Sequence, residues 1–86
     1  MFVKAKDTLV NMDNIVSVVV EYGGSGVRDR LRFSSRDGMK YVEVYTSNGR
    51  KTFEDFTNQI LMIEEKKLNK DNHVIILNQY LNEEKV

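Results

Sequence analysis

The first fifty or so residues carry short apolar runs and alternating apolar and polar positions, as β-strands do. Residues 2–5 and 8–10 predict two short strands joined as a hairpin across Lys6-Asp7. Residues 15–22 are dense in β-branched side chains and predict the strongest strand. Because both of its faces carry apolar groups, we expect this strand to be central in a sheet or covered on each side.

The segment 27–47 predicts a hairpin whose register follows from its turn. Asp37-Gly38 favours a two-residue type I′ turn between the two strands. This register gives five cross-strand pairs: Phe33–Val42 and Leu31–Val44 on an apolar side, and Arg32–Glu43, Arg30–Tyr45 and Arg28–Ser47 on the other. A shift of one residue would destroy both sets of matches, so the pattern specifies the pairing.

An amphipathic helix is expected after this hairpin, ending near Leu68. Its apolar stripe recurs at spacings of three, four and three residues: Phe53, Phe56, Ile60 and Ile63. Thr52 and Asp55 resemble a capping box at the start of the helix. Before them, Asn48-Gly49 predicts a second turn, after which residues 50–53 add a short strand.

The C-terminal segment 73–85 has two interpretations. Residues 74–77, Val-Ile-Ile-Leu, suit a strand, whereas the spacing of Val74, Leu77 and Leu81 suits a helix. The polar run 82–85 lacks a turn residue and favours a second helix. The expected fold is therefore α+β: an antiparallel meander of four to five strands, with one amphipathic helix packed on it and a short C-terminal helix.

Composition fits one small domain. With 86 residues, 41% of them apolar and none of them cysteine, the chain predicts a single domain over 1–86 without disulfides or a thiolate zinc site. Residues 1–53 are expected to be β-rich and 54–86 mostly helical. The N-terminus lacks an apolar signal segment, and no apolar run approaches the roughly 18–20 residues that span a bilayer. We therefore expect a cytoplasmic protein that does not enter a membrane.

Charge is balanced overall but unevenly distributed. Residues 28–51 carry seven basic and three acidic side chains, a net charge of +4, whereas residues 52–86 carry a net charge of −3. Such a polarised molecule can attract partners, including a second copy of itself. A dedicated nucleic-acid binder usually shows a larger positive excess.

The candidate binding residues lie in the 28–47 hairpin. Five side chains would form its face: Arg28, Arg30, Arg32, Tyr41 and Tyr45. Arginine and tyrosine are enriched at protein interfaces, and basic side chains beside aromatic ones also suit single-stranded nucleic acid. Glu43 opposite Arg32, and Arg30 packed over Tyr45, also fit a charged solvent face without a partner.

No set of residues predicts catalysis, a metal site or a cofactor. The lone histidine, His73, stands beside a polar turn, and an enzyme would need it in a cleft near a serine or a carboxylate. The segment 23–26, Gly-Gly-Ser-Gly, invites a phosphate-loop interpretation, but neither a Lys-Ser/Thr pair nor a helix follows it. We interpret it as a loop between strands.

Apolar residues outnumber what one small core needs. Both faces of 15–22, together with Met39, Leu61, Met62, Ile75 and Ile76, make up this excess. Either a C-terminal helix covers the second face of the sheet or a partner does, of which a symmetric homodimer is the commonest form.

A resemblance supports a modest role. Residues 10–15, Val-Asn-Met-Asp-Asn-Ile, lead into a strand, and residues 47–53, Ser-Asn-Gly-Arg-Lys-Thr-Phe, lead into a helix. Together they resemble FlbD-like proteins and related uncharacterised bacterial or phage β-sheet-plus-helix proteins, over about half of the chain. The resemblance implies a small non-catalytic bacterial or phage protein.

The sequence therefore predicts a non-enzymatic binding or regulatory module. It would act through protein–protein contacts, either with another protein or with a second copy of itself in a homodimer. The alternative is a single-stranded nucleic-acid binder that uses the same arginine and tyrosine face. No cofactor is expected in either case.

Overall fold

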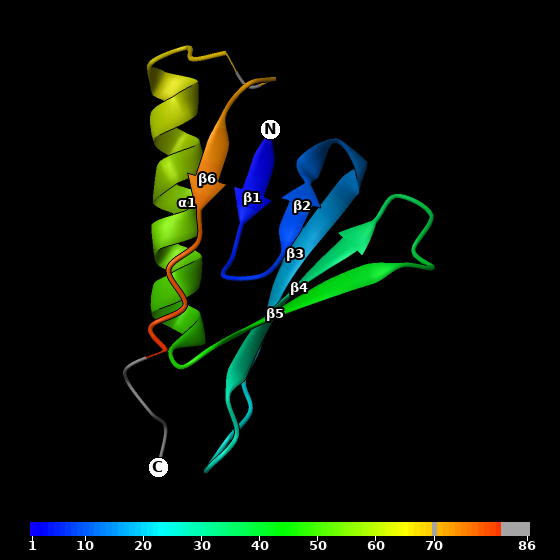
Figure 1. The fold of residues 1–86 in the computed structure, drawn as a ribbon, viewed down its shortest axis with the longest axis vertical. Helices are drawn as coiled ribbons and strands as arrows, with labels where there is room; N and C mark the ends of the chain where they lie inside the picture. Colours follow the sequence, from blue (N-terminus) through cyan, green and yellow to red (C-terminus); the bar gives the residue numbers. More distant parts are fainter. Residues whose placement is uncertain (70, 82–86) are drawn as a thin grey trace.

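The computed structural model describes residues 1–69 and 71–81, which contain six strands, one α-helix and one turn of 3-10 helix (Figure 1). The strands are β1 (Phe2–Lys4), β2 (Leu9–Asn11), β3 (Ile15–Glu21), β4 (Asp29–Ser35), β5 (Tyr41–Thr46) and β6 (Val74–Ile76). The helix α1 spans Gly49–Glu65, and the 3-10 turn η1 (Met12–Asn14) joins β2 to β3. The α+β class is confirmed, but the described strands form two three-stranded sheets rather than one meander of four to five strands.

Strands β3, β4 and β5 form an antiparallel meander in that order, called sheet B here. Four of the pairs expected between β4 and β5 are confirmed: Phe33–Val42, Leu31–Val44, Arg32–Glu43 and Arg30–Tyr45. The expected Arg28–Ser47 pair lies outside this ladder, which begins at Asp29–Thr46. The register holds because a slip of one residue would turn Leu31 and Phe33, both fully buried, toward solvent.

The loop between β4 and β5 differs from the expected two-residue turn. The Ser35 N–H donates to Lys40 O at 2.9 Å, so residues 36–39 form a four-residue loop. Gly38 has a φ of 72°, but Asp37 does not adopt the positive φ that a type I′ turn requires. The Asp37 carboxylate instead accepts hydrogen bonds from the Ser35 hydroxyl at 2.6 Å and the Met39 N–H at 3.0 Å. A side chain therefore closes this loop without altering the strand register.

Strands β2, β1 and β6 form the other sheet, called sheet A, in that order. The hairpin of β1 and β2 across Lys6-Asp7 is confirmed, and β6 adds to the other edge of β1 in parallel. The helix expected over 73–85 is wrong where the structure describes it, since Val74–Ile76 is a strand; residues 82–85 lie outside the described residues. The edge of β1 decides this, because its polar groups need partners: the Phe2 N–H donates to His73 O at 3.0 Å, and the Leu77 N–H donates to Lys4 O at 2.8 Å.

After β6 the chain joins the two sheets through Gln79. The Lys6 N–H of sheet A donates to Gln79 Oε1 at 2.8 Å, and Gln79 Nε2 donates to Tyr45 O of sheet B, also at 2.8 Å. The buried Thr46 hydroxyl donates to Gln79 O at 2.7 Å. These bonds cover the end of β5, so the C-terminal segment is part of the packed structure through Gln79.

The helix α1 begins earlier than expected. Asn48 is its N-cap, with its side chain accepting from the Lys51 N–H at 3.1 Å, so Asn48-Gly49 is not a hairpin turn and residues 50–53 are not a strand. Thr52 is buried inside the helix and does not form the expected cap with Asp55. The expected apolar stripe is confirmed, because Phe56 and Ile63 are buried and Phe53 and Ile60 pack against the core. The helix is too short and too polar to cross a membrane, and no other described helix could do so.

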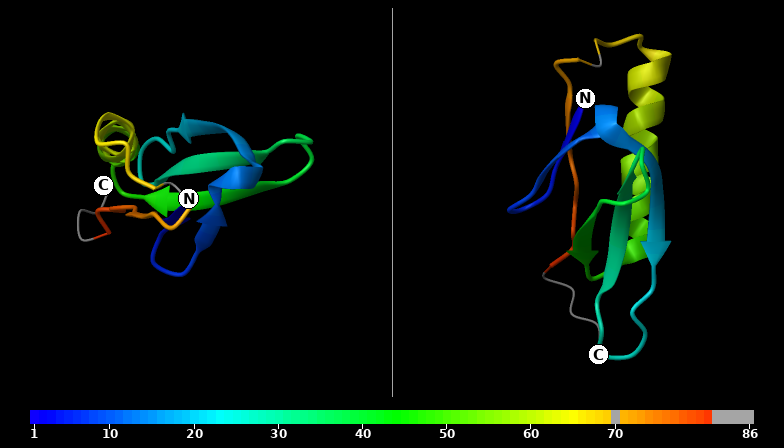
Figure 2. Two further views of the ribbon diagram at one scale, coloured as in Figure 1. Left: turned by 90° about the horizontal axis from the view of Figure 1, so that it is seen from above. Right: turned by 90° about the vertical axis from the view of Figure 1, so that its right-hand side faces the viewer.

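The core lies between the inner faces of the two sheets and is closed on one side by α1 (Figures 1 and 2). Sheet A contributes Val3, Val10 and Ile75, sheet B contributes Leu31, Phe33 and Val44, and the helix contributes Phe56 and Ile63. Phe33 and Phe56 meet edge to face with ring centroids 5.9 Å apart.

The sequence led us to expect that β3 is central in a sheet or covered on each side. In the structure it is instead an edge strand of sheet B. Its Val18 and Val20 pack against the core, whereas Val16 and Val19 are exposed. Seen from above, β3 runs along the side of sheet B that faces away from sheet A (Figure 2, left). Only one face of this apolar strand is therefore covered by the described residues.

Candidate functional site

The face of sheet B that points away from the core collects the predicted binding residues. Alternation along each strand places three residues from each of β3, β4 and β5 on this outer face. They form three cross-strand rows: Ser17–Ser34–Tyr41, Val19–Arg32–Glu43 and Glu21–Arg30–Tyr45. The inner face carries the alternate residues of β4, Leu31 and Phe33, which the core buries.

Two arginines and two glutamates form a closed ion network at the centre of the outer face. Arg30 Nε lies 3.1 Å from Glu21 Oε1 and 3.6 Å from Glu43 Oε2. Arg32 lies 3.2 Å from the same two carboxylates, through Nε to Glu21 and through Nη2 to Glu43. Each arginine thus lies between two carboxylates, and the four charges cancel.

Hydrogen bonding differs within this network. Arg30 Nε donates to Glu21, and Arg32 Nη2 donates to Glu43 at 3.2 Å. The Arg32 Nε is buried and has no hydrogen-bond partner among the described residues, so its 3.2 Å contact with Glu21 is electrostatic only. The hydrogen bond to Glu21, and then the charge of that carboxylate, raise the pKa of Arg30. Arg30 therefore stays charged at any ordinary pH.

Tyrosines border the network on β5. The Arg32 guanidinium lies 4.5 Å from the centroid of the Tyr41 ring, a cation–π contact. The Tyr45 hydroxyl is 3.5 Å from Glu43 Oε2. Even so, Tyr41 and Tyr45 remain 57% and 49% exposed, and Val19 on the opposite side of the network is 51% exposed. The outer face therefore combines a neutral centre with exposed aromatic and apolar borders.

The structure brings together four of the five predicted binding residues: Arg30, Arg32, Tyr41 and Tyr45. Arg28 lies before β4, exposed, in the loop that follows the glycine-rich segment. The sequence did not identify Glu21 and Val19 as members of this face. Their alternation with Ser17 was visible, but only the β3–β4 register places them beside Arg30 and Arg32, and the glycine-rich loop does not specify that register.

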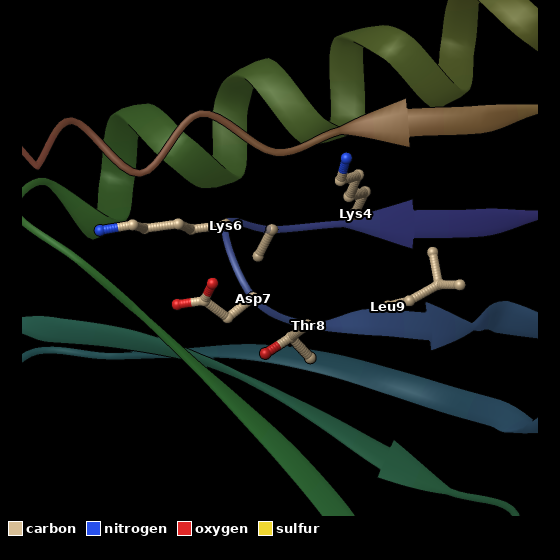
Figure 3. Close-up of a pocket in the computed structure, with 6 residues that line it drawn as sticks. Lys4, Lys6, Asp7, Thr8 and Leu9 are labelled. Atoms are coloured by element: carbon tan, nitrogen blue, oxygen red, sulfur yellow. The ribbon is translucent and has the colours of Figure 1, made fainter.

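The other described parts of the structure offer fewer groups for catalysis, metal binding or ligand binding. No described residue bonds to the His73 side chain, and no group of three His, Cys, Asp or Glu residues among those described could hold a metal ion. A pocket of about 430 Å³ is a surface hollow on the β1–β2 hairpin (Figure 3). Its Lys4, Lys6 and Leu9 side chains point in different directions and do not converge on a common point. Neither feature forms a site as coherent as the outer face of sheet B.

Comparisons with family models, curated proteins and solved structures found no match to this chain. The resemblance to FlbD-like proteins stays a prediction. The functional inference therefore depends on the geometry of the outer face itself.

Proposed function

We propose that this protein is a non-enzymatic binding module whose outer face of sheet B contacts a partner protein. The observation that carries the proposal is the composition of that face. Exposed Tyr41, Tyr45 and Val19 surround a network of arginines and glutamates whose charges cancel. Tyrosine and arginine are the residues that most often dominate the binding energy of protein interfaces.

The same network argues against a phosphate backbone as the ligand. A phosphate at Arg30 or Arg32 would have to displace Glu21 or Glu43 while lying close to the other carboxylate. Two further basic residues of the positively charged segment 28–51, Arg50 and Lys51, do not extend this face, because they belong to α1. There Arg50 pairs with Glu54 at 3.3 Å, and Lys51 lies over the Tyr80 ring.

A protein partner meets fewer obstacles. Its polar groups can bond to the outer lone pairs of the carboxylates without breaking the ion pairs, and its apolar groups can cover the tyrosine rings. The side chains also stand on a three-stranded sheet and hold each other in place, so little conformational entropy is lost on binding. These properties suit a recognition surface that exists before the partner arrives.

The experiment removes the tyrosines and leaves the network. We expect Tyr41→Ser/Tyr45→Ser to lose the polypeptides that the immobilised wild-type protein retains from an extract of its native host. Met39→Ser is the control, because Met39 is 84% exposed but lies in the β4–β5 loop rather than on the outer face. Circular dichroism checks that all three proteins are folded, and the retained partner is then purified and titrated.

Two results would overturn the proposal. One is an affinity of the double variant for the purified partner that stays within about twofold of the wild type. Tyrosines that contribute to binding should cost more than this when they are removed, because a loss of only about 1.4 kcal/mol already weakens binding tenfold. The other is tight binding of a single-stranded oligonucleotide by the wild type at low salt, falling steeply as salt rises. The second result would support the nucleic-acid alternative instead.

A further inference from the structure

The free edge of β3 is built to accept another strand. Among the described residues, sheet B ends at β3. The Ile15 N–H bonds to Met12 O of η1, but residues 17–21 form backbone hydrogen bonds with no described element except β4. The described part of the C-terminal segment pairs with β1 and β5 instead, so it does not cover this edge. A β-strand edge with unpaired polar groups is a template for strand addition.

The hydrogen-bond pattern identifies the residues that present those groups. Ser35 N–H donates to Lys40 O, so Ser35 turns its backbone groups to β5, and alternation requires the same of Phe33 and Leu31. Arg30, Arg32 and Ser34 therefore turn theirs to β3, where they pair with Glu21, Val19 and Ser17. The N–H and C=O groups of Val18 and Val20 are left facing the free edge.

This edge lacks the features that usually prevent pairing. The chain has no proline, and β3 has no lysine. Its one charged residue, Glu21, points to the outer face, where it pairs with Arg30 and Arg32. The β-bulge between Ile15 and Ser17 disturbs only the start of the strand. Five consecutive residues, 17–21, remain regular and available.

We propose that a second copy of this chain pairs with β3 in antiparallel orientation about a two-fold axis, which extends sheet B to six strands. Val18 and Val20 must supply the hydrogen bonds, which leaves three registers: Val18 opposite the partner's Val18, Val18 opposite the partner's Val20, or Val20 opposite the partner's Val20. The middle register places Val19 opposite the partner's Val19.

Side-chain matching selects that middle register. On the outer face it pairs Val19 with itself and Ser17 with the partner's Glu21, and at the ends it brings Val16 opposite the partner's Tyr22. All three apolar side chains are more than half exposed in the single chain, at 51%, 56% and 66% for Val19, Val16 and Tyr22. The other two registers place a charged side chain opposite an apolar one. The register centred on Val18 sets Glu21 opposite the partner's Ile15, and the register centred on Val20 sets Val19 opposite the partner's Glu21. Self-complementarity of this kind favours a second copy over an unrelated strand.

The dimer shares Val19 with the proposed partner-binding face, but it leaves the tyrosines of β5, on the other edge of sheet B, uncovered, so the two proposals can be tested separately. A two-fold axis perpendicular to the sheet keeps both outer faces on one side. The dimer would therefore present two copies of the ion network and its tyrosine borders on one continuous surface.

A charge-swap experiment at Val19 tests the register itself. We expect the wild type to sediment as a dimer at about 100 µM, and Val19→Lys and Val19→Glu each to weaken dimerisation by at least about tenfold, since like charges directly opposite each other repel. An equimolar mixture of the two variants should recover the dimer, because opposite charges then meet across the axis. Tyr45→Lys, also on the outer face but two strands away from the axis, should remain dimeric.

Amide exchange gives a second measurement that needs no variant. Exchange at Val18 and Val20 should slow as the protein concentration rises, while exchange at Leu9 on the edge strand β2 should not change. A monomeric wild type at 100 µM, a dimeric Val19→Lys, or a mixture that fails to associate would each overturn the proposal. None of these results bears on partner binding through Tyr41 and Tyr45, so the two proposals fail separately.

Discussion

One buried carboxylate links three segments of the chain. Asp29 is only 3% exposed, and it accepts hydrogen bonds from the Gly23 N–H at 3.0 Å and the Gly49 N–H at 2.8 Å. Its negative charge thus lies at the first residue of α1, where the helix dipole is positive and backbone N–H groups lack partners. Asp29 fixes the start of the helix against sheet B.

Gly49 makes this contact possible, and its replacement tests it. A Cβ at position 49 would lie 2.8 Å from Asp29 Cβ and 2.9 Å from Val20 Cγ1, closer than packed carbon atoms allow. Gly49→Ala gains up to about 1 kcal/mol of helix propensity, but overpacking typically costs about 1–3 kcal/mol, so we expect net destabilisation. Urea unfolding measures the difference, with Asn58→Ala on the exposed face of α1 as the control. A Gly49→Ala variant as stable as that control would contradict the close contact.

Asp37 predicts a pH effect with a defined sign. The hydrogen bond from the Ser35 hydroxyl, followed by that from the Met39 N–H, lowers the pKa of Asp37 below its ordinary value of 3.8. Ionised Asp37 therefore favours the folded state above that pH, and the contribution is lost as the pH falls through the folded pKa. We expect Asp37→Asn to be less stable than the wild type near neutral pH, with the difference shrinking below 3.8.

Urea unfolding midpoints measured across pH for both proteins check this expectation. Asp7→Asn, which removes an exposed carboxylate from the β1–β2 hairpin, serves as the control. A stability difference between Asp37→Asn and the wild type that is the same at about pH 2 and at neutral pH would contradict the assignment.

At the scale of elements, the β4–β5 hairpin could be predicted because both of its faces constrain it. Leu31 and Phe33 need a buried side, and Arg32 needs Glu43 opposite it, so one register satisfies both requirements. The loop type could not be predicted in the same way. Asp-Gly suits a type I′ turn, but the Asp37 side chain closes a four-residue loop within the same register.

The errors arose where distant segments decide local structure. Asn48-Gly49 suits a hairpin turn and a helix start equally well, and the choice is made by Asp29, which lies some twenty residues earlier. Residues 74–77 suit a strand and a helix, and the free edge of β1, some seventy residues earlier, makes them a strand. Local pattern carries no information about either contact.

The part of the candidate site that lies on β4 and β5 could also be predicted, whereas the part on β3 could not. Alternation and the hairpin register place Arg30, Arg32, Tyr41 and Tyr45 on one face. They also identify Glu43 as one neutralising partner. The other, Glu21, comes from β3 through a register that the glycine-rich loop does not define, so the sequence left the face more basic than it is.

Removing both carboxylates should therefore expose the basic character of the face. We expect Glu21→Gln/Glu43→Gln to gain binding to a single-stranded oligonucleotide at low salt, because Arg30 and Arg32 are then free to contact phosphates. The loss of stability should stay near 1 kcal/mol, as for other partly exposed ion pairs. Fluorescence anisotropy measures the binding as salt is varied.

The matched control is Glu54→Gln/Glu65→Gln, which raises the net charge equally but on α1. Equal oligonucleotide binding by the two double variants would mean that net charge alone is responsible. Absence of binding by Glu21→Gln/Glu43→Gln would mean that the arginines cannot reach phosphates even without their partners. Either result would contradict the masking role of the network.

At the scale of the whole molecule, neither sheet has a core of its own. The inner side chains of sheet A meet those of sheet B, and α1 closes the space between them. Gln79 bonds to both sheets, to the Lys6 N–H on one side and to Tyr45 O on the other. A three-stranded sheet with strands of three residues, such as sheet A, would not be stable alone. The two sheets should therefore unfold together.

Substitution of Ile75 in sheet A tests this cooperativity. Ile75 is fully buried in the shared core, so Ile75→Ala should cost about 2–5 kcal/mol. The chain has no tryptophan, and three of its four tyrosines belong to sheet B or to the residue after β3, so tyrosine fluorescence reports mainly on sheet B. We expect the fluorescence and far-ultraviolet circular dichroism midpoints in urea to coincide and to shift equally. The adjacent Ile76→Ala, at an exposed position, should shift both by less than about 0.5 kcal/mol. A fluorescence midpoint that Ile75→Ala leaves unchanged would mean that sheet B folds without sheet A.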